Sequence, residues 1–481
     1  MADATDITFL ADLGLASDQY SVDETVRAEH ATDWGTDDAD GVAPTAVVYP
    51  ESTADVAAVL EAANDHAIPV TPYAAGTSLE GNPIPTRGGI SLDCTRMDAI
   101  EAIRPADLQI DVEPGLIGSE INAALEEYGL FFPPMPQSAD ISTIGGMIAN
   151  DASGAKTVKY GEIHEWVRAL EVVLADGSVV ELGSKAKKSS SGYNLKDLIV
   201  GSEGTLGVVT RATLELTPKP AQIRGGRAVF ESVTAATDAI SAAITAGIDV
   251  ATIELIDPLS ARITNEEFDL DLPDAPMVFL EFHAAHSIET EVDRCRAIFD
   301  DHGLLRMDMA SEPAEMERLW EARSDLANAV GRYREDLRML TFGDVTVPMG
   351  EYSTIVGYIR SLAAEHDRLI PAFGHAGDGN VHYTVLVDPD DPDDVAFGKE
   401  LMDRIIDRAL ELGGTATGEH GIGRGKREFM TAEHGARGVA LMRGIKQTFD
   451  PNDILNPGKL FPETKDGGRV KFEEDPPDSG A

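Results

Sequence analysis

Residues 72–81 read PYAAGTSLEG, a loop of small residues between two stretches with the character of strands, IPVTPYA at 68–74 and GGISLD at 88–93. A strand, loop, strand order with so little side-chain bulk lets backbone N–H groups approach the phosphates of a ligand. The loop is neither GxGxxG opening a helix nor GxxxxGK[ST], so a Rossmann dinucleotide site and a P-loop are both unsupported. An ordinary glycine turn is the alternative.

Two further segments of small residues lie downstream of this loop. They are TIGGMIANDASGAKTVKYG at 143–161 and GSEGTLGVVT at 201–210. Three segments that expose backbone within one half of the chain favour a ligand over three unrelated turns, because their N–H groups can follow a long molecule. The sequence therefore indicates a long ligand that contains a pyrophosphate.

The first half of the chain has an α+β pattern. PTAVVYP at 44–50 predicts a short strand, and residues 52–67 predict a helix with Ser52 or Thr53 as N-cap. A further helix is expected over 119–128, and strands alternate with turns up to Pro218 and Pro220, where the composition changes.

The second half predicts a ferredoxin-like module. A strand at 226–231, a helix at 232–246, strands at 250–257 and 277–284, a helix at 288–302 and a strand at 304–309 give a β-α-β-β-α-β order. Further expected elements are a helix over 313–333, a strand over 340–347, a helix over 351–365, strands over 369–375 and 380–387, and a helix that starts after 390–394 and stops at Gly413.

Composition and charge restrict the partners and the compartment. The 84 acidic and 39 basic residues give a net charge of −45, which argues against nucleic acid and anionic membrane as partners. Acids spread along the whole chain indicate adaptation to a saline cytoplasm, with an acidic mesophile protein as the alternative.

Cys94 and Cys295 form no CxxC and indicate a reducing compartment. No apolar run of membrane-spanning length and no signal-peptide pattern occur, so we expect a cytoplasmic protein without a transmembrane segment.

A candidate metal site lies in GHAGDGNVH at 374–382. A two-residue turn at Asp378-Gly379 would place His375 opposite His382, close enough for both imidazoles to share one divalent ion. Glu419 in GEHG offers a third ligand, and the adjacent His420 offers a neutral imidazole for removing a hydroxyl proton. Core or surface histidines, and an exposed loop histidine at 420, are the alternatives from local sequence.

Taken together, the motifs resemble a known flavoprotein family. PTAVVYP, PYAAGTSLEG, PPMPQSADISTIGG, KYGEI, LEVVLADG and GSEGTLGVVT look like the FAD-binding domain of the vanillyl-alcohol oxidase and p-cresol methylhydroxylase superfamily. With IELID, FLEFH, GHAGDGNVH, GEHGIGRGKRE and DPNDILNPGKLF, residues 42–461 resemble the D-lactate dehydrogenase (cytochrome) and glycolate oxidase flavin subunit branch.

The resemblance implies an α+β fold with a two-part FAD-binding domain and a ferredoxin-like substrate (cap) domain. We expect a lead-in segment at 1–42, the FAD-binding domain at 43–220, the cap domain with the metal site at 221–395, a helical segment returning to the FAD domain at 396–462, and a disordered acidic tail at 463–481. The 71–81 loop contains no His or Cys, so the expected FAD is non-covalent. By resemblance, the residues that line FAD are Tyr73, Ala74, Ala75, Gly76, Thr77, Ser78, Gly81, Ile144, Gly145, Gly146, Asn150, Ser153, Gly154, Glu203, Gly207, Val209 and Asn456.

The resemblance also implies the catalytic residues. His375, His382 and Glu419 match positions that bind a zinc- or manganese-like ion, and a mixed N/O donor set suits either metal. His420 matches the base, and Arg323 matches the arginine that binds the substrate carboxylate, although a surface helix arginine is the alternative. The expected reaction is metal-assisted deprotonation of a 2-hydroxy acid and hydride transfer to flavin N5.

Two departures from the family pattern bear on the substrate. Relatives specific for D-2-hydroxyglutarate carry Thr and Lys where this chain has Ala327 and Phe342, so D-lactate is the expected substrate. Glycolate, one methyl smaller, remains open, as do a D-2-hydroxyglutarate dehydrogenase and a non-catalytic flavin subunit of a redox complex. Without iron–sulfur or haem motifs, the electrons must leave to an external acceptor such as a cytochrome, a quinone or an electron-transfer protein. Any membrane association would be peripheral, through that acceptor.

Overall fold

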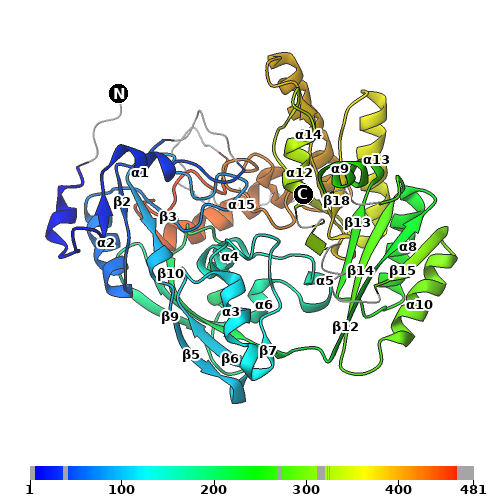
Figure 1. The fold of residues 1–481 in the computed structure, drawn as a ribbon. Coiled ribbons are helices and arrows are strands. Elements are labelled where there is room, and N and C mark those ends of the chain that lie inside the picture. The colour runs from blue at the N-terminus through cyan, green and yellow to red at the C-terminus, as the bar shows by residue number, and fades with distance from the viewer. Residues whose placement is uncertain are drawn as a thin grey trace, which may run out of the picture.

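The computed structural model describes residues 6–35, 42–268, 272–310, 320, 321, 323 and 325–462. The chain folds into two lobes, with the N-terminal strands in one and β12 to β15 in the other (Figure 1). The first part of the helix expected over 313–333 and the tail expected at 463–481 lie outside the described residues. No helix in the described ranges combines the length and the apolar character needed to cross a membrane.

The first lobe begins with a four-stranded sheet in the order β1-β2-β4-β3. The helix α2 (Thr53–Asp65) begins at Ser52, whose side chain accepts a hydrogen bond from Asp55 N, as the N-cap pattern predicts. It buries the apolar stripe from Val56 to Ala63 against the strands. The strands are β1 (Tyr20–Ser21), β2 (Ala46–Val48), β3 (Val70–Tyr73) and β4 (Ile90–Asp93), and the short elements before β2 are η1 (Thr8–Asp12) and α1 (Glu24–Glu29).

A five-stranded antiparallel sheet in the order β5-β6-β10-β8-β9 completes this lobe. The helix expected over 119–128 is shorter, because α3 ends at Ala124 and a 3-10 turn over Glu126–Tyr128 leads to Gly129 at φ 63°. The bounds are β5 (Ile100–Arg104), β6 (Gln109–Val112), β8 (Val167–Val173), β9 (Val179–Gly183), β10 (Val208–Glu215), α3 (Gly118–Ala124), α4 (Ile144–Asn150), α5 (Thr157–Tyr160), α6 (Ile163–Trp166), α7 (Lys196–Ile199), and the paired β7 (Leu130–Phe131) and β11 (Thr217–Pro218).

The second lobe contains a seven-stranded sheet in the order β15-β12-β14-β13-β18-β19-β17. Its first four strands and the helices α8 and α10 form the expected ferredoxin-like unit. α9 was not expected between β13 and β14, and it packs with α12 on the sheet face opposite α8 and α10. The bounds are β12 (Gln222–Phe230), α8 (Val233–Thr245), β13 (Thr252–Ile256), α9 (Pro258–Phe268), β14 (Met277–Ala284), α10 (Glu289–Asp300), β15 (Leu304–Met309), α12 (Leu326–Arg332) and β17 (Gly343–Thr346).

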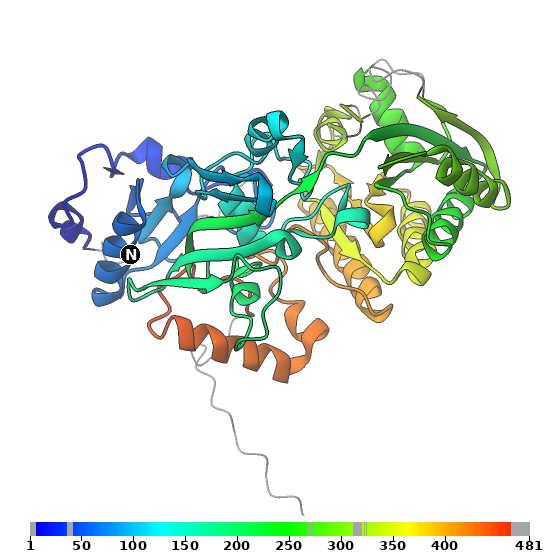
Figure 2. The same ribbon diagram turned by 90° about the horizontal axis from the view of Figure 1, so that it is seen from below.

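The chain then returns from the second lobe to the first. α14 ends at Glu411 and is followed by Gly413 at φ 80°, as the double glycine predicts. α15 packs beneath the first lobe (Figure 2), where Lys446 donates hydrogen bonds to the carbonyls of Thr205 and Leu455. The bounds are β16 (Arg338–Met339), α13 (Tyr352–Glu365), β18 (Ala372–Gly374), β19 (Asn380–Tyr383), β20 (Leu386–Val387), α14 (Pro392–Glu411) and α15 (Met430–Phe449).

Candidate active site

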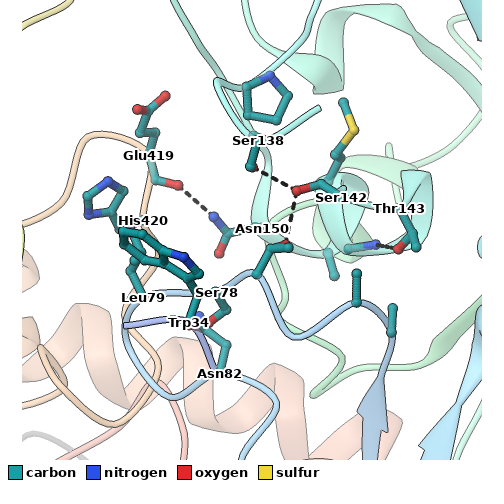
Figure 3. Close-up of a pocket in the computed structure, with 18 of the residues that line it drawn as sticks. Trp34, Ser78, Leu79, Asn82, Ser138, Ser142, Thr143, Asn150, Glu419 and His420 are labelled. Atoms are coloured by element: carbon teal, nitrogen blue, oxygen red, sulfur yellow. Dashed lines mark hydrogen bonds between the residues drawn. The ribbon is translucent and has the colours of Figure 1, made fainter. Parts of the chain in front are cut away.

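A cavity of about 880 Å³ lies where the two lobes meet. Its walls come from the first-lobe loops near residues 72–83, 136–153 and 199–209, and from residues of the second lobe. Figure 3 shows Ser142 and Asn150 of these loops together with Glu419 and His420. The sequence-predicted residues that line it are Tyr73, Ala74, Ala75, Gly76, Thr77, Ser78, Gly145, Gly146, Asn150, Ser153, Glu203, Gly207, Val209, Arg323, His375, His382, Glu419, His420 and Asn456.

Three of the expected FAD residues do not reach the cavity wall. Ile144 is fully buried in the core beneath it. Gly81 donates its N–H to Asp33 and lies against Arg424. A Cβ at Gly154 would lie 2.3 Å from the carbonyl oxygen of Met135, so this glycine permits a close backbone approach instead. These positions support the cavity wall from behind.

The loop that carries Glu419 and His420 is fastened to the first lobe by Glu203. The buried Glu203 carboxylate accepts hydrogen bonds from Asn82 Nδ2 at 2.7 Å, Ile422 N at 2.7 Å and Gly423 N at 2.9 Å. Burial raises the pKa of Glu203 even though these bonds lower it. Asn150 donates to the carbonyl oxygen of Glu419 at 2.5 Å (Figure 3). The expected FAD-binding loops and the expected catalytic loop therefore share one hydrogen-bond network.

The histidine turn differs from the sequence prediction. Phe373, not His375, lies opposite His382, and residues Ala376–Asp378 form a 3-10 turn that ends at Gly379 in the left-handed region. The two-residue turn is wrong because Asp378 N and Asn380 N both donate to the His375 carbonyl, which closes a longer loop. The imidazoles still meet, with ring centroids 5.1 Å apart and planes at 88°.

These two histidines and Glu419 converge on one point. His375 Nε2 lies 3.1 Å and His382 Nε2 lies 3.2 Å from Glu419 Oε1. His375 Nδ1 lies 2.6 Å from Glu254 Oε1, and an Nδ1–H donated to this carboxylate leaves Nε2 free as a ligand. Burial lowers the pKa of His375, but Glu254 and Glu419 raise it well above its ordinary value, so an ion bound at Nε2 would have to displace a proton from it. Two imidazole nitrogens and a carboxylate oxygen are a donor set that fits a divalent ion.

Asp344 holds the loop that carries Glu419 and His420 in place through its buried carboxylate. Its fully buried Oδ2 accepts hydrogen bonds from Gly418 N at 2.7 Å, Glu419 N at 2.7 Å and His420 N at 2.9 Å. Burial favours a neutral carboxyl, but the neighbouring basic side chains of His420, Lys426 and His382 hold the pKa of Asp344 well below its ordinary range. The carboxylate therefore stays ionised beneath the loop.

His420 is a largely buried imidazole, 11% exposed, whose ring stacks on His382 with centroids 5.2 Å apart. Its Nδ1 lies 3.9 Å from Asp344 Oδ2 and has no hydrogen-bond partner. Burial lowers the pKa of His420 to about 4, with the charges of His382 and Lys426 acting in the same direction and Asp344 opposing them. The side chain is neutral near pH 7 and can accept a proton.

Arg323 is buried at the cavity wall and not on the surface. Its Nε lies 2.8 Å and its Nη2 lies 2.6 Å from Glu254 Oε2, and its guanidinium lies 5.0 Å from the centroid of the Phe373 ring. Nη2 nevertheless has no hydrogen bond of good geometry, so the guanidinium retains donor capacity. Glu254 is fully buried and connects this arginine to His375 through its two oxygens.

Sequence reasoning missed three residues of the site. Glu254 and Asp344 stand within the strands TIELI and GDVT, where a charged residue in an apolar strand was the available signal. Trp34 lies in the segment treated as a lead-in. It lines the cavity because its backbone N–H donates to the Gly76 carbonyl at 2.8 Å.

Comparisons with known proteins place this chain in a family. Residues 44–183 match the FAD binding domain, and residues 219–460 match the C-terminal domain of FAD linked oxidases. The chain belongs to the FAD-linked oxidase family. It is 36% identical to glycolate oxidase subunit GlcD of Bacillus subtilis, covering 87% of this chain and 89% of that protein. It is 35% identical to a probable mitochondrial D-lactate dehydrogenase of Danio rerio, covering 92% of this chain and 89% of the relative.

Solved structures confirm the expected fold class. The chain is similar to 4-ethylphenol oxidase from Gulosibacter chungangensis, with a TM-score of 0.76 and 20% identity over 96% of this chain and 99% of that one. It is also similar to p-cresol methylhydroxylase, with a TM-score of 0.76 and 17% identity over 93% of this chain and 95% of that one. The α+β fold of the vanillyl-alcohol oxidase and p-cresol methylhydroxylase type is thus confirmed, and the chain is an FAD-linked oxidoreductase.

Proposed function

We propose that this FAD-linked oxidoreductase oxidises D-2-hydroxy acids, with D-lactate converted to pyruvate as the reference reaction. The observation that carries the proposal is the convergence of a buried arginine, a two-histidine and carboxylate cluster and a neutral histidine on the cavity lined by the expected FAD loops. Relatives named D-lactate dehydrogenase and glycolate oxidase subunit support the same chemistry. A glycolate-oxidising activity is the second candidate, because the identity to both kinds of relative is 36%.

Each side chain has a distinct role in this proposal. Arg323 binds the substrate carboxylate through its remaining donors, and Glu254 holds the guanidinium in place. A zinc- or manganese-like ion held by His375 Nε2, His382 Nε2 and Glu419 would lower the pKa of the substrate hydroxyl as a Lewis acid. FAD, bound without a covalent link, would accept the hydride from the Cα atom of the substrate.

His420 is the proposed base. With Nδ1 directed at Asp344, the expected tautomer carries its proton on Nδ1 and leaves Nε2 free to accept the hydroxyl proton. The ionised Asp344 then stabilises the imidazolium that forms. Only 11% of the His420 side chain is exposed, which limits competition from bulk water for the proton.

The electrons are proposed to leave through an external acceptor, because the two cysteines are buried and free and form no cluster motif. A cytochrome, a quinone or an electron-transfer protein would serve. We also propose a cytoplasmic location, with any membrane contact made through that acceptor. We further propose that the net charge of −45 adapts the protein to high salt.

Stopped-flow reduction of the bound flavin under anaerobic conditions tests the proposal. We expect D-lactate to reduce the wild-type flavin, and His420→Ala to slow that step by about 10² to 10⁴, the usual contribution of a general base. Arg323→Ala should instead act mainly through weaker substrate binding. A His420→Ala protein that reduces its flavin at the wild-type rate would rule out the proposed base.

A further inference from the structure

A row of aromatic rings leads from the histidine cluster along the cavity wall. Phe373 lies 5.9 Å from His382, Phe342 lies 6.2 Å from Phe373, and Trp34 lies 6.2 Å from Phe342, all between ring centroids. Trp34, Phe342 and Phe373 all line the cavity. The rings of Trp34 and Phe342 are stacked, with 18° between their planes.

The row has a rigid inner part and an open outer end. Phe342 and Phe373 are 4% and 2% exposed and belong to the core shared with α9 and α12. Trp34 is 44% exposed although two backbone hydrogen bonds, Trp34 N to Gly76 O and Gly35 N to Ser78 O, hold its segment beside the cavity. A large apolar ring held at a cavity wall is a surface that an apolar ligand group can contact.

The row begins where the substrate carboxylate is expected to bind. The Arg323 guanidinium lies over Phe373, so a 2-hydroxy acid bound there would have Phe342 and then Trp34 ahead of its side chain. Arg323 is the one Lys or Arg among the described residues that line the cavity, whereas Glu321 and Asp325 also line it. Among the described lining residues, a second carboxylate would therefore meet aromatic rings and acidic groups and no further Lys or Arg.

We propose that Trp34, Phe342 and Phe373 bind an apolar substrate side chain longer than a methyl group. The preferred substrates would be D-2-hydroxy acids with branched-alkyl or phenyl side chains, with lactate and glycolate as weaker substrates. This inference rests on the proposed function, since it concerns the far end of the same substrate. A methyl group can contact one ring of the row, whereas a branched-alkyl or phenyl group can contact two and cover the face of Trp34.

The test is anaerobic flavin reduction by glycolate, D-lactate, D-2-hydroxybutyrate, D-2-hydroxyisocaproate, D-3-phenyllactate and D-2-hydroxyglutarate. We expect the ratio of reduction rate to substrate Kd to rise about fourfold for each methylene buried against the rings, and D-2-hydroxyglutarate to be poor. Trp34→Ala should remove most of the gain for the long side chains, so that the ratio of D-2-hydroxyisocaproate to glycolate reduction falls toward one. Trp34→Phe should restore part of it. Tyr193→Ala, an exposed aromatic outside the cavity, is the matched control and should change nothing.

Each outcome separates this inference from the proposed function. A wild-type preference for D-lactate over D-2-hydroxyisocaproate would overturn the inference and leave D-2-hydroxy acid oxidation intact. A Trp34→Ala protein that loses activity equally on glycolate and on long substrates would also overturn it, because the tryptophan would then only position the 76–78 loop. Failure of every 2-hydroxy acid to reduce the wild-type flavin would instead overturn the proposed function.

Discussion

Replacing Asp344 by Asn should damage the catalytic loop while preserving the fold. The carboxylate accepts three loop N–H bonds, from Gly418, Glu419 and His420, and all three are 2.9 Å or shorter. The carboxamide of the variant has nearly the same shape as the carboxylate that it replaces. Asn380 now donates to this carboxylate, and its own Oδ1 lacks a partner. Rotation of the Asn380 amide would let Oδ1 accept a hydrogen bond from the new carboxamide N–H. The three N–H bonds can therefore survive, but their acceptor becomes neutral.

The magnitude follows from that loss of charge. A hydrogen bond to a charged group contributes about 1.5–3 kcal/mol and a neutral one about 0.5–1.5 kcal/mol, so three bonds lose roughly 3 kcal/mol together. The same loop carries a proposed metal ligand and the proposed base, and a displacement of about 1 Å can slow catalysis by about 10²-fold. Asp344→Asn should therefore lower stability by about 3 kcal/mol and flavin reduction by about two orders of magnitude.

Urea unfolding and stopped-flow flavin reduction measure the two effects separately. Asp257→Asn is the matched control, because Asp257 is also buried in the second lobe and accepts a hydrogen bond from Ser260 N but does not line the cavity. Asn caps a helix about as well as Asp, so the control should keep the wild-type reduction rate. An Asp344→Asn protein with wild-type stability and wild-type flavin reduction would refute the role given to this carboxylate.

Three further outcomes are expected. EDTA or His382→Ala should abolish turnover and leave flavin absorbance intact, because the metal donors and the FAD loops come from different segments; loss of the flavin as well would contradict the assignment. Burial would raise the pKa of Asp111, but hydrogen bonds from Arg104, Lys185 and Thr213 hold it below its ordinary range. Asp111→Asn should thus cost about 2–3 kcal/mol in urea unfolding at pH 7, and the gap to wild type should narrow as pH falls below about 4. The melting temperature should rise from millimolar to molar KCl as the net charge of −45 is screened; an unchanged value would contradict the salt adaptation.

The regular periodicity of the sequence was enough to predict much of the fold. The stripe from Val56 to Ala63 defines α2, and the strand and helix order from 226 to 309 gives the ferredoxin-like unit. α9 was missed because its sequence, PLSARITNEEF, mixes apolar and polar residues over only 11 positions and follows directly on a strand. The length of the turn after His375 was missed because it depends on carbonyl hydrogen bonds that Asp-Gly alone does not specify.

The candidate site was predictable where local motifs carry it and not where distant segments meet. His375, His382 and Glu419 lie in glycine-rich motifs, and the structure brings them within hydrogen-bond distance. Glu254 lies 121 positions before His375 in the chain and forms a hydrogen bond with it. The register between their two strands brings these residues together, and no local motif shows this pairing. Trp34 reaches the cavity through backbone hydrogen bonds to the 76–78 loop, which no side-chain pattern signals.

An anaerobic absorbance titration of the bound flavin with D- and L-lactate tests the central claim most directly. The proposed function predicts that the D enantiomer bleaches the flavin, that the L enantiomer does not, and that bleaching by the D enantiomer is about 10² to 10⁴ times slower in His420→Ala. A flavin that remains oxidised with D-lactate and with every other D-2-hydroxy acid would contradict it.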